Sequence, residues 1–134
     1  MHIVITGGAG FLGQKLARYL ITSALPLDSL QLVDIVEPVI PIRDPRVSVT
    51  YTDLREAGSL ASVITPDIDC IFHLAAVVSS HAEKDFDAGL SVNLDMTRQL
   101  LEHCRRTNPD VRFIFASSVA VFGGHIPNLS LIHI

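Results

Sequence analysis

Short apolar runs rich in β-branched residues alternate along this chain with longer segments in which apolar residues recur every three or four positions. Runs of the first kind predict buried strands, and the three-to-four-residue period predicts amphipathic helices. We expect strands at residues 2–6, 30–35, 47–50, 70–75 and 111–116. We expect helices at residues 11–24, 53–64 and 83–107.

Two of these helices carry more specific predictions. Asp53 followed by Glu56 has the spacing of a capping box, which opens a helix at residue 53. In the long helix, side chains fall on one face at three- and four-residue steps: Phe86, Leu90, Leu94, Thr97, Leu101 and Cys104. We expect that face to be buried and Asn93 to lie within it.

The order of the elements predicts the fold. Strands that alternate with helices favour a parallel sheet covered on both faces. We therefore predict an α/β fold, a Rossmann-like doubly wound parallel sheet with about five strands in the order 3-2-1-4-5. Such a sheet is incomplete, because the usual dinucleotide-binding sheet continues to a sixth strand.

Composition narrows the class of protein. The 134 residues are 49% hydrophobic and 18% charged, which is typical of one globular domain and excludes disorder, collagen and repeat arrays. With 10 Lys and Arg against 14 Asp and Glu, the formal net charge of −4 argues against a nucleic-acid partner. No apolar stretch reaches the length of a membrane span, and the first residues resemble no secretory signal, so we expect no membrane partner and a cytoplasmic protein.

Cysteine and histidine positions predict neither a disulfide scaffold nor a metal site. Cys70 and Cys104 lie far apart and form no Cys-x-x-Cys pair. The six histidines show no His-x-x-x-His spacing. We expect both thiols to be core residues and no metal to be bound.

A glycine-rich loop follows the first predicted strand. Gly7, Gly10 and Gly13 give a G-x-x-G-x-x-G pattern between that strand and a helix. In this position the glycines permit a sharp turn, close approach of a diphosphate to the backbone, and tight packing of the helix. An ordinary glycine-rich turn is the alternative. A nucleotide-hydrolysing P-loop is excluded, because Gln14 stands where its lysine is required.

Two acidic residues could bind a nucleotide next to this loop. Asp34 ends the second predicted strand, 21 residues after Gly13, where a carboxylate can accept hydrogen bonds from both ribose hydroxyls. The same charge would repel a 2′-phosphate, so NAD is favoured over NADP; the alternative is an aspartate that only forms a turn. Asp53 could contact adenine, cap a helix, or do both.

Several motifs together resemble the extended short-chain dehydrogenase/reductase superfamily, the NAD-dependent epimerases and dehydratases, over residues 1–127. They are Gly7/Gly10/Gly13, Asp34, Asp53-Leu54, His73-Leu74-Ala75-Ala76, Asn93 and Ser117–Gly123. A second set resembles the dehydrogenases of sugar acids within that superfamily: Val77–Ser80, Ala82-Glu83, Asp85–Asp87, Val92–Asp95 and Ser118–Gly124.

The resemblance implies roles for individual residues. The cofactor would contact the start of the glycine helix and the end of the fourth strand, through Gly7, Gly10, Phe11, Leu12, Gly13, Asp34, Asp53, Leu54, Ala75, Ala76, Val77 and Asn93. Ser118 would be the catalytic serine that hydrogen-bonds the reacting substrate oxygen, supported by Asn93, and Ser79 would lie near the ribose or the substrate. The alternatives are a turn serine at 118, a satisfied mid-helix amide at 93 and small core residues at 75 and 76.

The superfamily's catalytic Tyr-x-x-x-Lys does not occur in these 134 residues, since neither Tyr19 nor Tyr51 has a lysine four positions later. We therefore expect residues 1–128 to be the N-terminal part of an NAD-binding domain, residues 129–134 to be a non-native tail, and the C-terminal substrate lobe to be absent. Such a chain alone would be inactive, because the tyrosine moves the hydroxyl proton.

For the parent protein, the resemblance implies an NAD-dependent dehydrogenase that oxidises a secondary alcohol of a sugar acid such as D-erythronate. The resemblance thus implies a small-molecule substrate, and it leaves open whether the full-length protein forms a homodimer. The alternatives are a nucleotide-sugar epimerase or dehydratase, which shares the superfamily motifs, and a non-catalytic NAD-binding or sensor module.

Overall fold

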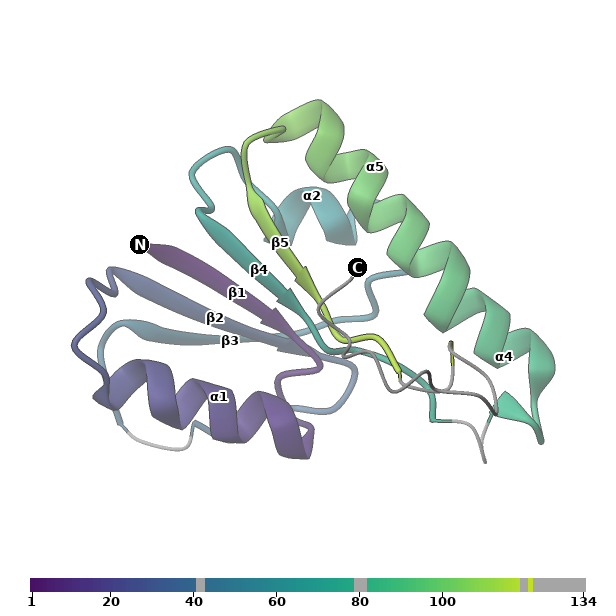
Figure 1. Cartoon of the computed structure of the whole chain (residues 1–134), viewed down its shortest axis with the longest axis horizontal. Helices are drawn as coiled ribbons and strands as arrows, with labels where there is room; N and C mark the ends of the chain where they lie inside the picture. Colours follow the sequence, from purple (N-terminus) through teal and green to yellow (C-terminus); the bar gives the residue numbers. More distant parts are fainter. Residues whose placement is uncertain (41–42, 79–81, 119–120, 122–134) are drawn as a thin grey trace, which may run out of the picture.

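One parallel sheet forms the centre of the computed structural model, which describes residues 1–40, 43–78, 82–118 and 121. Its five strands are arranged in the order β3-β2-β1-β4-β5 (Figure 1). The strands are β1 (His2–Thr6), β2 (Ser29–Asp34), β3 (Val47–Tyr51), β4 (Cys70–His73) and β5 (Arg112–Phe115). All four pairings are parallel, and the predicted fold class and strand order are confirmed.

Helices cover both faces of the sheet. They are α1 (Phe11–Thr22), α2 (Ser59–Val63), α4 (Phe86–Leu90), the π-helix η1 (Ser91–Met96) and α5 (Thr97–Thr107). Figure 1 shows α1 on one side and α2, α4 and α5 on the other. Because side chains alternate along a strand, Ile3 and Ile5 pack towards α1, whereas Val4 joins the core beneath α2 and α5.

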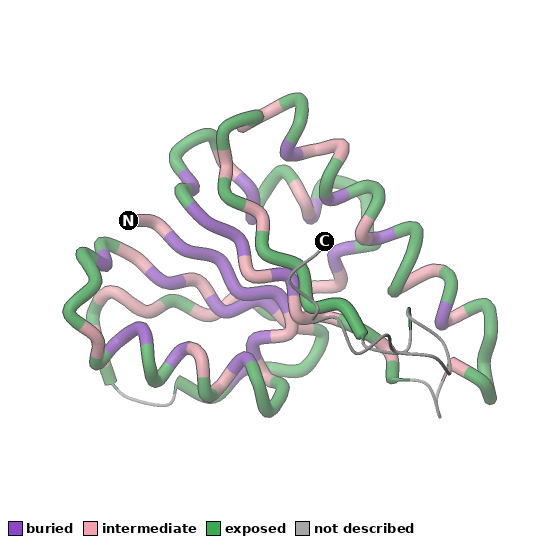
Figure 2. The backbone as a smooth tube through the Cα atoms, viewed as in Figure 1, coloured by how far each residue is buried: buried purple, intermediate pink, exposed green. Residues whose placement is uncertain are grey.

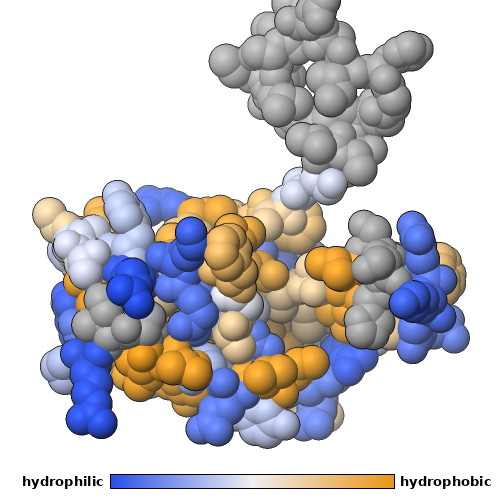
Figure 3. Space-filling model, turned by 90° about the horizontal axis from the view of Figure 1, so that it is seen from below, coloured by the Kyte–Doolittle hydropathy of each residue, from blue (hydrophilic) through white to orange (hydrophobic). Residues whose placement is uncertain are grey.

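Burial is greatest in the middle of the sheet. Figure 2 shows the buried residues concentrated in β1, β2 and β4 and on the inner faces of the helices. Apolar side chains also reach the surface between hydrophilic ones (Figure 3). Within the described ranges, no helix combines the length and apolar character that a bilayer crossing requires.

The strands begin and end close to the predicted residues, but β4 is shorter than expected. Its pairing with β1 ends at Thr6 and His73, not at Ala75. The reason is the turn at Gly7, which has a positive φ of 72° and leads the chain away from the sheet. Residues 74–77 therefore leave the sheet and form a loop at its edge, although the N–H groups of Leu74 and Ala75 still donate to the carbonyl and hydroxyl oxygens of Thr6 at the end of β1.

The predicted helix over residues 53–64 was wrong in its first half. The helix begins at Ser59, and Asp53 caps no helix. The Asp53 carboxylate instead accepts hydrogen bonds from the backbone N–H of Arg55 at 2.9 Å and from its guanidinium. Gly58, with φ of 85°, then separates this turn from α2. The residues with capping-box spacing therefore form a turn at Asp53, and the ion pair between Asp53 and Arg55 closes this turn.

The long helix predicted over residues 83–107 is confirmed over residues 86–107, where α4, η1 and α5 follow one another without a break, but the face predicted to be buried was wrong. Most of the face expected to be buried is exposed: Phe86 by 69%, for example, and Leu101 by 46%. The buried residues are Gly89, Met96, Leu100 and Cys104. Asn93 is exposed and lies outside this stripe. A π-turn contains one more residue than an α-helical turn. It therefore rotates the residues before it about the helix axis relative to those after it, which changes the face that packs on the sheet.

Candidate functional site

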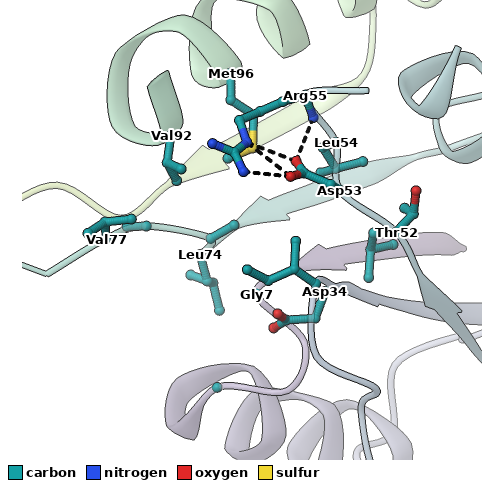
Figure 4. Close-up of a pocket in the computed structure, with 15 residues that line it drawn as sticks. Gly7, Asp34, Thr52, Asp53, Leu54, Arg55, Leu74, Val77, Val92 and Met96 are labelled. Atoms are coloured by element: carbon teal, nitrogen blue, oxygen red, sulfur yellow. Dashed lines mark hydrogen bonds and ion pairs between the residues drawn. The ribbon is translucent and has the colours of Figure 1, made fainter. Parts of the chain in front are cut away.

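A cleft runs along the carboxyl edge of the sheet, between the loops that follow β1, β2, β3 and β4 (Figure 4). It forms where the loop after β1 leads to α1 on one face and the loop after β4 leads to α4 on the other. Crevices at such switch points are the usual ligand sites of doubly wound sheets. The lining residues are Gly7, Gly10, Val33, Asp34, Ile35, Thr52, Asp53, Leu54, Arg55, Leu74, Ala75, Ala76, Val77, Val92 and Met96.

The glycine turn leaves no room for side chains at Gly7, at Gly8, where a Cβ would lie 2.9 Å from that of Leu32, or at Gly13. A Cβ on Gly7 would lie 2.7 Å from the backbone nitrogen of Ala75, and one on Gly13 would lie 2.3 Å from the carbonyl oxygen of Gly7. A Cβ on Gly10 would meet only the Gly7 oxygen, at 3.2 Å. The first turn of α1 therefore packs directly on the loop, and the backbone at Gly10 faces the cleft.

The N-terminus of α1 opens onto this cleft. Gly10 precedes the helix, and no side chain of the described residues caps it. The first N–H groups of a helix have no partner within it, and together with the helix dipole they attract anions. The start of α1 can therefore accept a phosphate group.

Asp34 lies at the end of β2 beside the glycine turn (Figure 4). Its Oδ2 accepts a hydrogen bond from the N–H of Ala9 at 2.9 Å, and its Oδ1 accepts one from the N–H of Val36 at 3.2 Å. These two contacts fix the carboxylate, and each oxygen keeps a lone pair for another donor. The group is thus held ready to accept hydrogen bonds from a pair of hydroxyls.

Asp53 and Arg55 form an ion pair at the far wall of the cleft (Figure 4). The shortest distance joins Oδ2 of Asp53 to a terminal guanidinium nitrogen at 2.6 Å. The hydrogen bonds from Arg55 lower the pKa of Asp53, and the same bonds raise the pKa of Arg55. Arg55 also donates to Oγ of Ser91 at 3.4 Å. The pair is therefore a fixed polar wall, and a contact of Asp53 with adenine stays a prediction.

A second hollow lies on the other side of the loop after β4. Its lining includes Ala75–Val77, Asn93, Thr97, Phe115 and Ser118. The fold therefore brings Ser118, which follows β5, to the hollow that Asn93 also lines. The side-chain amide of Asn93 pairs with both backbone groups of Val77, with the N–H donating at 2.8 Å and the carbonyl accepting at 2.9 Å. Asn93 thus holds the loop that separates the two hollows.

The predicted cofactor residues are distributed unevenly around the cleft. Eight of them line it: Gly7, Gly10, Asp34, Asp53, Leu54, Ala75, Ala76 and Val77. The side chains of Phe11 and Leu12 are exposed at the start of α1 and lie outside the lining, and Gly13 is buried beneath the turn. Ser79 falls outside the described residues.

Sequence reasoning missed seven lining residues: Val33, Ile35, Thr52, Arg55, Leu74, Val92 and Met96. Most adjoin predicted residues and could have been found by extending each motif by one or two positions. Val92 and Met96 carry a different signal, since they share a four-residue spacing with the buried Leu100 and Cys104.

The thiols and acidic groups give no sign of a metal centre. Among the residues that the structure describes, no three His, Cys, Asp or Glu side chains gather closely enough to hold an ion. Cys70 and Cys104 are both buried, and burial raises the pKa of each thiol. Both groups are therefore held in the protonated, unreactive form.

Known proteins that are similar in sequence or structure point to the same kind of site as this geometry. A family model described as the NAD dependent epimerase/dehydratase family matches residues 3–131. The chain belongs to this family. Among curated relatives, the D-erythronate dehydrogenases of Haemophilus influenzae and Cupriavidus necator are 52% and 48% identical over 98% and 95% of the chain. The chain spans 42% and 41% of their respective lengths.

Two solved structures resemble this fold. A nucleoside-diphosphate-sugar epimerase from Agrobacterium tumefaciens superposes with a TM-score of 0.79 at 37% identity, over 95% of this chain and 40% of the epimerase. MoeE5 in complex with UDP-glucuronic acid and NAD superposes with a TM-score of 0.78 at 27% identity, over 94% of this chain and 40% of MoeE5.

Proposed function

We propose that this chain forms the NAD-binding part of a dehydrogenase that oxidises a secondary alcohol of a sugar acid of the D-erythronate kind. The observation that carries the proposal is the fixed Asp34 carboxylate, which shares one cleft with the glycine turn that leads into the uncapped N-terminus of α1. The substrate class rests on the similarity to the two D-erythronate dehydrogenases.

The cleft has the chemical groups that NAD requires. A dinucleotide presents a diphosphate, ribose diols and flat apolar rings. The glycine turn and the start of α1 would hold the diphosphate through backbone N–H groups, and Asp34 would accept hydrogen bonds from a ribose diol. Val33, Ile35 and Met96 give apolar walls for a ring. The residues present therefore fit the cofactor.

The charge of Asp34 also selects between the two nicotinamide cofactors. NADP carries a phosphate where NAD carries a ribose hydroxyl, and a fixed carboxylate at that place repels the phosphate. The cations of the cleft do not offset this charge, because the guanidinium of Arg55 is already paired with Asp53. NAD is therefore the proposed cofactor.

The chain's own residues would position the reaction. NAD, when bound, supplies the acceptor of the hydride that leaves the alcohol carbon. Ala75–Val77 would form the wall beside the nicotinamide, Asn93 would hold that wall, and Ser118 would hydrogen-bond the reacting oxygen. Removal of the hydroxyl proton needs a general base, which the proposal assigns to the part of the relatives that this chain does not span.

A nucleoside-diphosphate-sugar epimerase is the second candidate, because the 37% identity to the Agrobacterium enzyme lies within the matched region. The two activities differ in their net product. A dehydrogenase accumulates NADH from NAD and a sugar acid, whereas an epimerase returns the hydride to its sugar and accumulates none.

Cofactor binding is tested by calorimetry on the chain and on Asp34→Ala. We expect NAD to bind more tightly than NADP, and Asp34→Ala to weaken NAD binding by about tenfold or more, since a hydrogen bond to a charged group contributes roughly 1.5–3 kcal/mol. Asp110→Ala is the matched control, because Asp110 is exposed at the opposite end of the sheet. Equal affinity of the wild-type chain for NAD and NADP, unchanged by Asp34→Ala, would reject the assignment.

The activity is tested on the protein encoded by the complete gene. The gene is first read beyond the codon for Asn128, where we expect a Tyr-x-x-x-Lys. The protein is then assayed for NADH formation with NAD and D-erythronate, and for epimerisation of a nucleoside-diphosphate sugar. NAD binding without turnover of either substrate would instead favour a non-catalytic module.

A further inference from the structure

A continuous series of hydrogen bonds runs beneath the loop that separates the two hollows. Oγ1 of Thr6 lies 2.7 Å from Nδ1 of His73, and Nε2 of His73 lies 2.9 Å from Oγ1 of Thr97. The Thr97 hydroxyl donates to the carbonyl oxygen of Asn93 at 2.9 Å, and the N–H of Ala75 donates to Oγ1 of Thr6 at 3.3 Å. Thr6 and His73 are almost fully buried, at 0% and 1% exposed.

The contacts require a proton on Nε2 of His73, and for a neutral ring they fix the direction of every hydrogen bond in the series. The Thr97 hydroxyl has one proton, which goes to Asn93, so its oxygen accepts the proton on Nε2 of His73. Nδ1 of the neutral ring then has no proton and accepts the hydroxyl of Thr6, whose oxygen accepts the N–H of Ala75. The opposite tautomer loses the contact with Asn93. All four contacts together therefore require a proton on Nε2 of His73, and in the neutral ring Nδ1 is the acceptor.

Burial favours the same state of the ring. Removing His73 from water disfavours its charged form and lowers its pKa. The rings of Phe113 and Phe115 lie 5.8 and 5.9 Å from the imidazole, centre to centre, and surround it with apolar area. A neutral imidazole, unlike a protonated one, can accept at one nitrogen while it donates at the other.

The series begins and ends at the same loop. It starts at the N–H of Ala75 and reaches the backbone of Asn93, whose side-chain amide holds both backbone groups of Val77. The loop is thus held at two residues that are two positions apart, and both line the cleft. Asn93 lies in the π-helix η1, and π-turns are rare elements that frequently occur at functional sites.

The opposite wall of the cleft is tied to the same series. Thr6 immediately precedes Gly7, and a Cβ on Gly7 would lie only 2.7 Å from the nitrogen of Ala75. The loop therefore packs closely on the backbone of the glycine turn, and the hydrogen bonds oppose its movement away from that turn. The width of the cleft at this point is set by these contacts.

We infer that His73 and Thr97 are positioning residues that set the Ala75–Val77 wall for the cofactor without touching it. The inference rests on the proposed function, because the affinity it affects is that for NAD. In physical terms, one series of hydrogen bonds, each with a defined donor and acceptor, connects β1, β4, α5 and η1 to the loop after β4.

The test compares three variants. Thr97→Val keeps the shape of the side chain and removes the hydroxyl, and Thr97→Ser keeps the hydroxyl. Thr107→Val is the matched control, because Thr107 also contacts a histidine on the same helix, at 3.4 Å from Nε2 of His103, and lies outside the series. Each protein is assayed for NAD affinity by calorimetry, thermal unfolding midpoint, imidazole ¹⁵N shifts and amide hydrogen exchange.

We expect the wild-type ¹⁵N shifts to report a proton on Nε2 of His73. Thr97→Val should weaken NAD binding by about fivefold to tenfold, the range that corresponds to one lost hydrogen bond, and should speed exchange at the Ala75 and Val77 amides by a similar factor. Thr97→Ser should restore both. Thr107→Val should alter neither, even where its unfolding midpoint falls.

Three results would overturn the inference. They are a proton on Nδ1 of His73 in the wild type, unchanged amide exchange at Ala75 and Val77 in Thr97→Val, and an NAD affinity of that variant within twofold of the wild type. Failure of the wild-type chain to bind NAD would reject the proposed function instead. The tautomer and the amide exchange would then still decide whether the series holds the loop.

Discussion

Gly13 is the residue at which the first turn of α1 crosses the glycine turn. A Cβ at this position would lie 2.3 Å from the Gly7 carbonyl oxygen, a backbone atom that cannot rotate away. Gly58 provides a contrast within the same chain. It has a positive φ of 85°, but a Cβ there would meet no atom within 4 Å. One glycine is thus required by space and the other by backbone conformation.

Gly13→Ala should therefore destabilise the protein more than Gly58→Ala. We expect Gly13→Ala to lower the free energy of unfolding by about 2 kcal/mol or more, because overpacking outweighs the gain in helix propensity. Gly58→Ala should lower it by about 1 kcal/mol, from the left-handed conformation alone. Urea denaturation of both variants measures the two values. A larger loss for Gly58→Ala would contradict the packing described for the glycine turn.

At the scale of elements, the π-helix η1 determines which residues of the following helix face the sheet. Leu100 of α5 is fully buried and Leu101, next to it, is 46% exposed. The sequence pattern had placed Leu101 on the buried face. The stripe that packs on the sheet consists of Met96, Leu100 and Cys104, together with the partly buried Val92.

Alanine substitutions at the two neighbouring leucines test this arrangement. Leu100→Ala should lower the free energy of unfolding by roughly 2–5 kcal/mol, because it removes buried contacts and leaves a cavity. Leu101→Ala should lower it by less than about 1 kcal/mol, as expected for a partly exposed position. Thermal and urea unfolding compare the two proteins. Similar losses for both variants would show that the side of α5 described as facing the sheet is wrong.

The strands and the glycine turn could be predicted from sequence, because their signals are local. A β-branched run such as residues 2–6 and a glycine at fixed spacing describe the conformation of the same few residues. Asp34 was placed at the cleft for the same reason. The capping spacing at Asp53 failed because Arg55, two residues later, offers its carboxylate a better partner than a helix N-terminus.

Which face of the long helix packs on the sheet could not be predicted from the sequence, because the signal is not local. Its sequence carries two apolar stripes, and a π-turn is a change of hydrogen-bond partner that no residue type signals. Val92 and Met96 line the cleft because they lie on the face that packs on the sheet, so they were missed when the other face was predicted to be buried. The hydrogen bonds of His73 join residues 6, 73 and 97, so they emerge only when β1, β4 and α5 are together.

At the scale of the whole molecule, four acidic groups of the described residues are held ionised by neighbouring basic groups. Arg46 lowers the pKa of Asp44 to about 2, and Arg105 and Arg106 lower that of Glu102 to about 2. The pKa values of Asp28 and Asp53 are also lowered, by the N-terminal amine and Arg55 respectively. The folded protein therefore binds protons less readily than the unfolded chain in acid.

This difference gives the pH dependence of stability a definite sign. A group with a lowered folded pKa stabilises the protein above its unfolded pKa, near 4, and loses that contribution as the pH falls towards its folded value, about 2 for Asp44 and Glu102. We expect the urea midpoint to fall between pH 5 and pH 2. Because these groups are near the surface, added salt should reduce the effect. A midpoint that stays constant or rises in acid would contradict this account.

The strand at the centre of the sheet is also the first of the five described strands to be synthesised. β1 pairs on one side with β2, in register with residues 29–33, but its other neighbour is β4, at residues 70–73. On the ribosome, the second edge of β1 thus stays unpaired until β4, which ends at His73, 39 residues after Asp34 ends β2, has left the exit tunnel. During that interval Val4 and Ile71, which later share one core, are on separate parts of the nascent chain. The arrangement that places the glycine turn between two neighbouring loops therefore delays completion of the sheet and lengthens the time for which a nascent edge is open to chaperones or to aggregation.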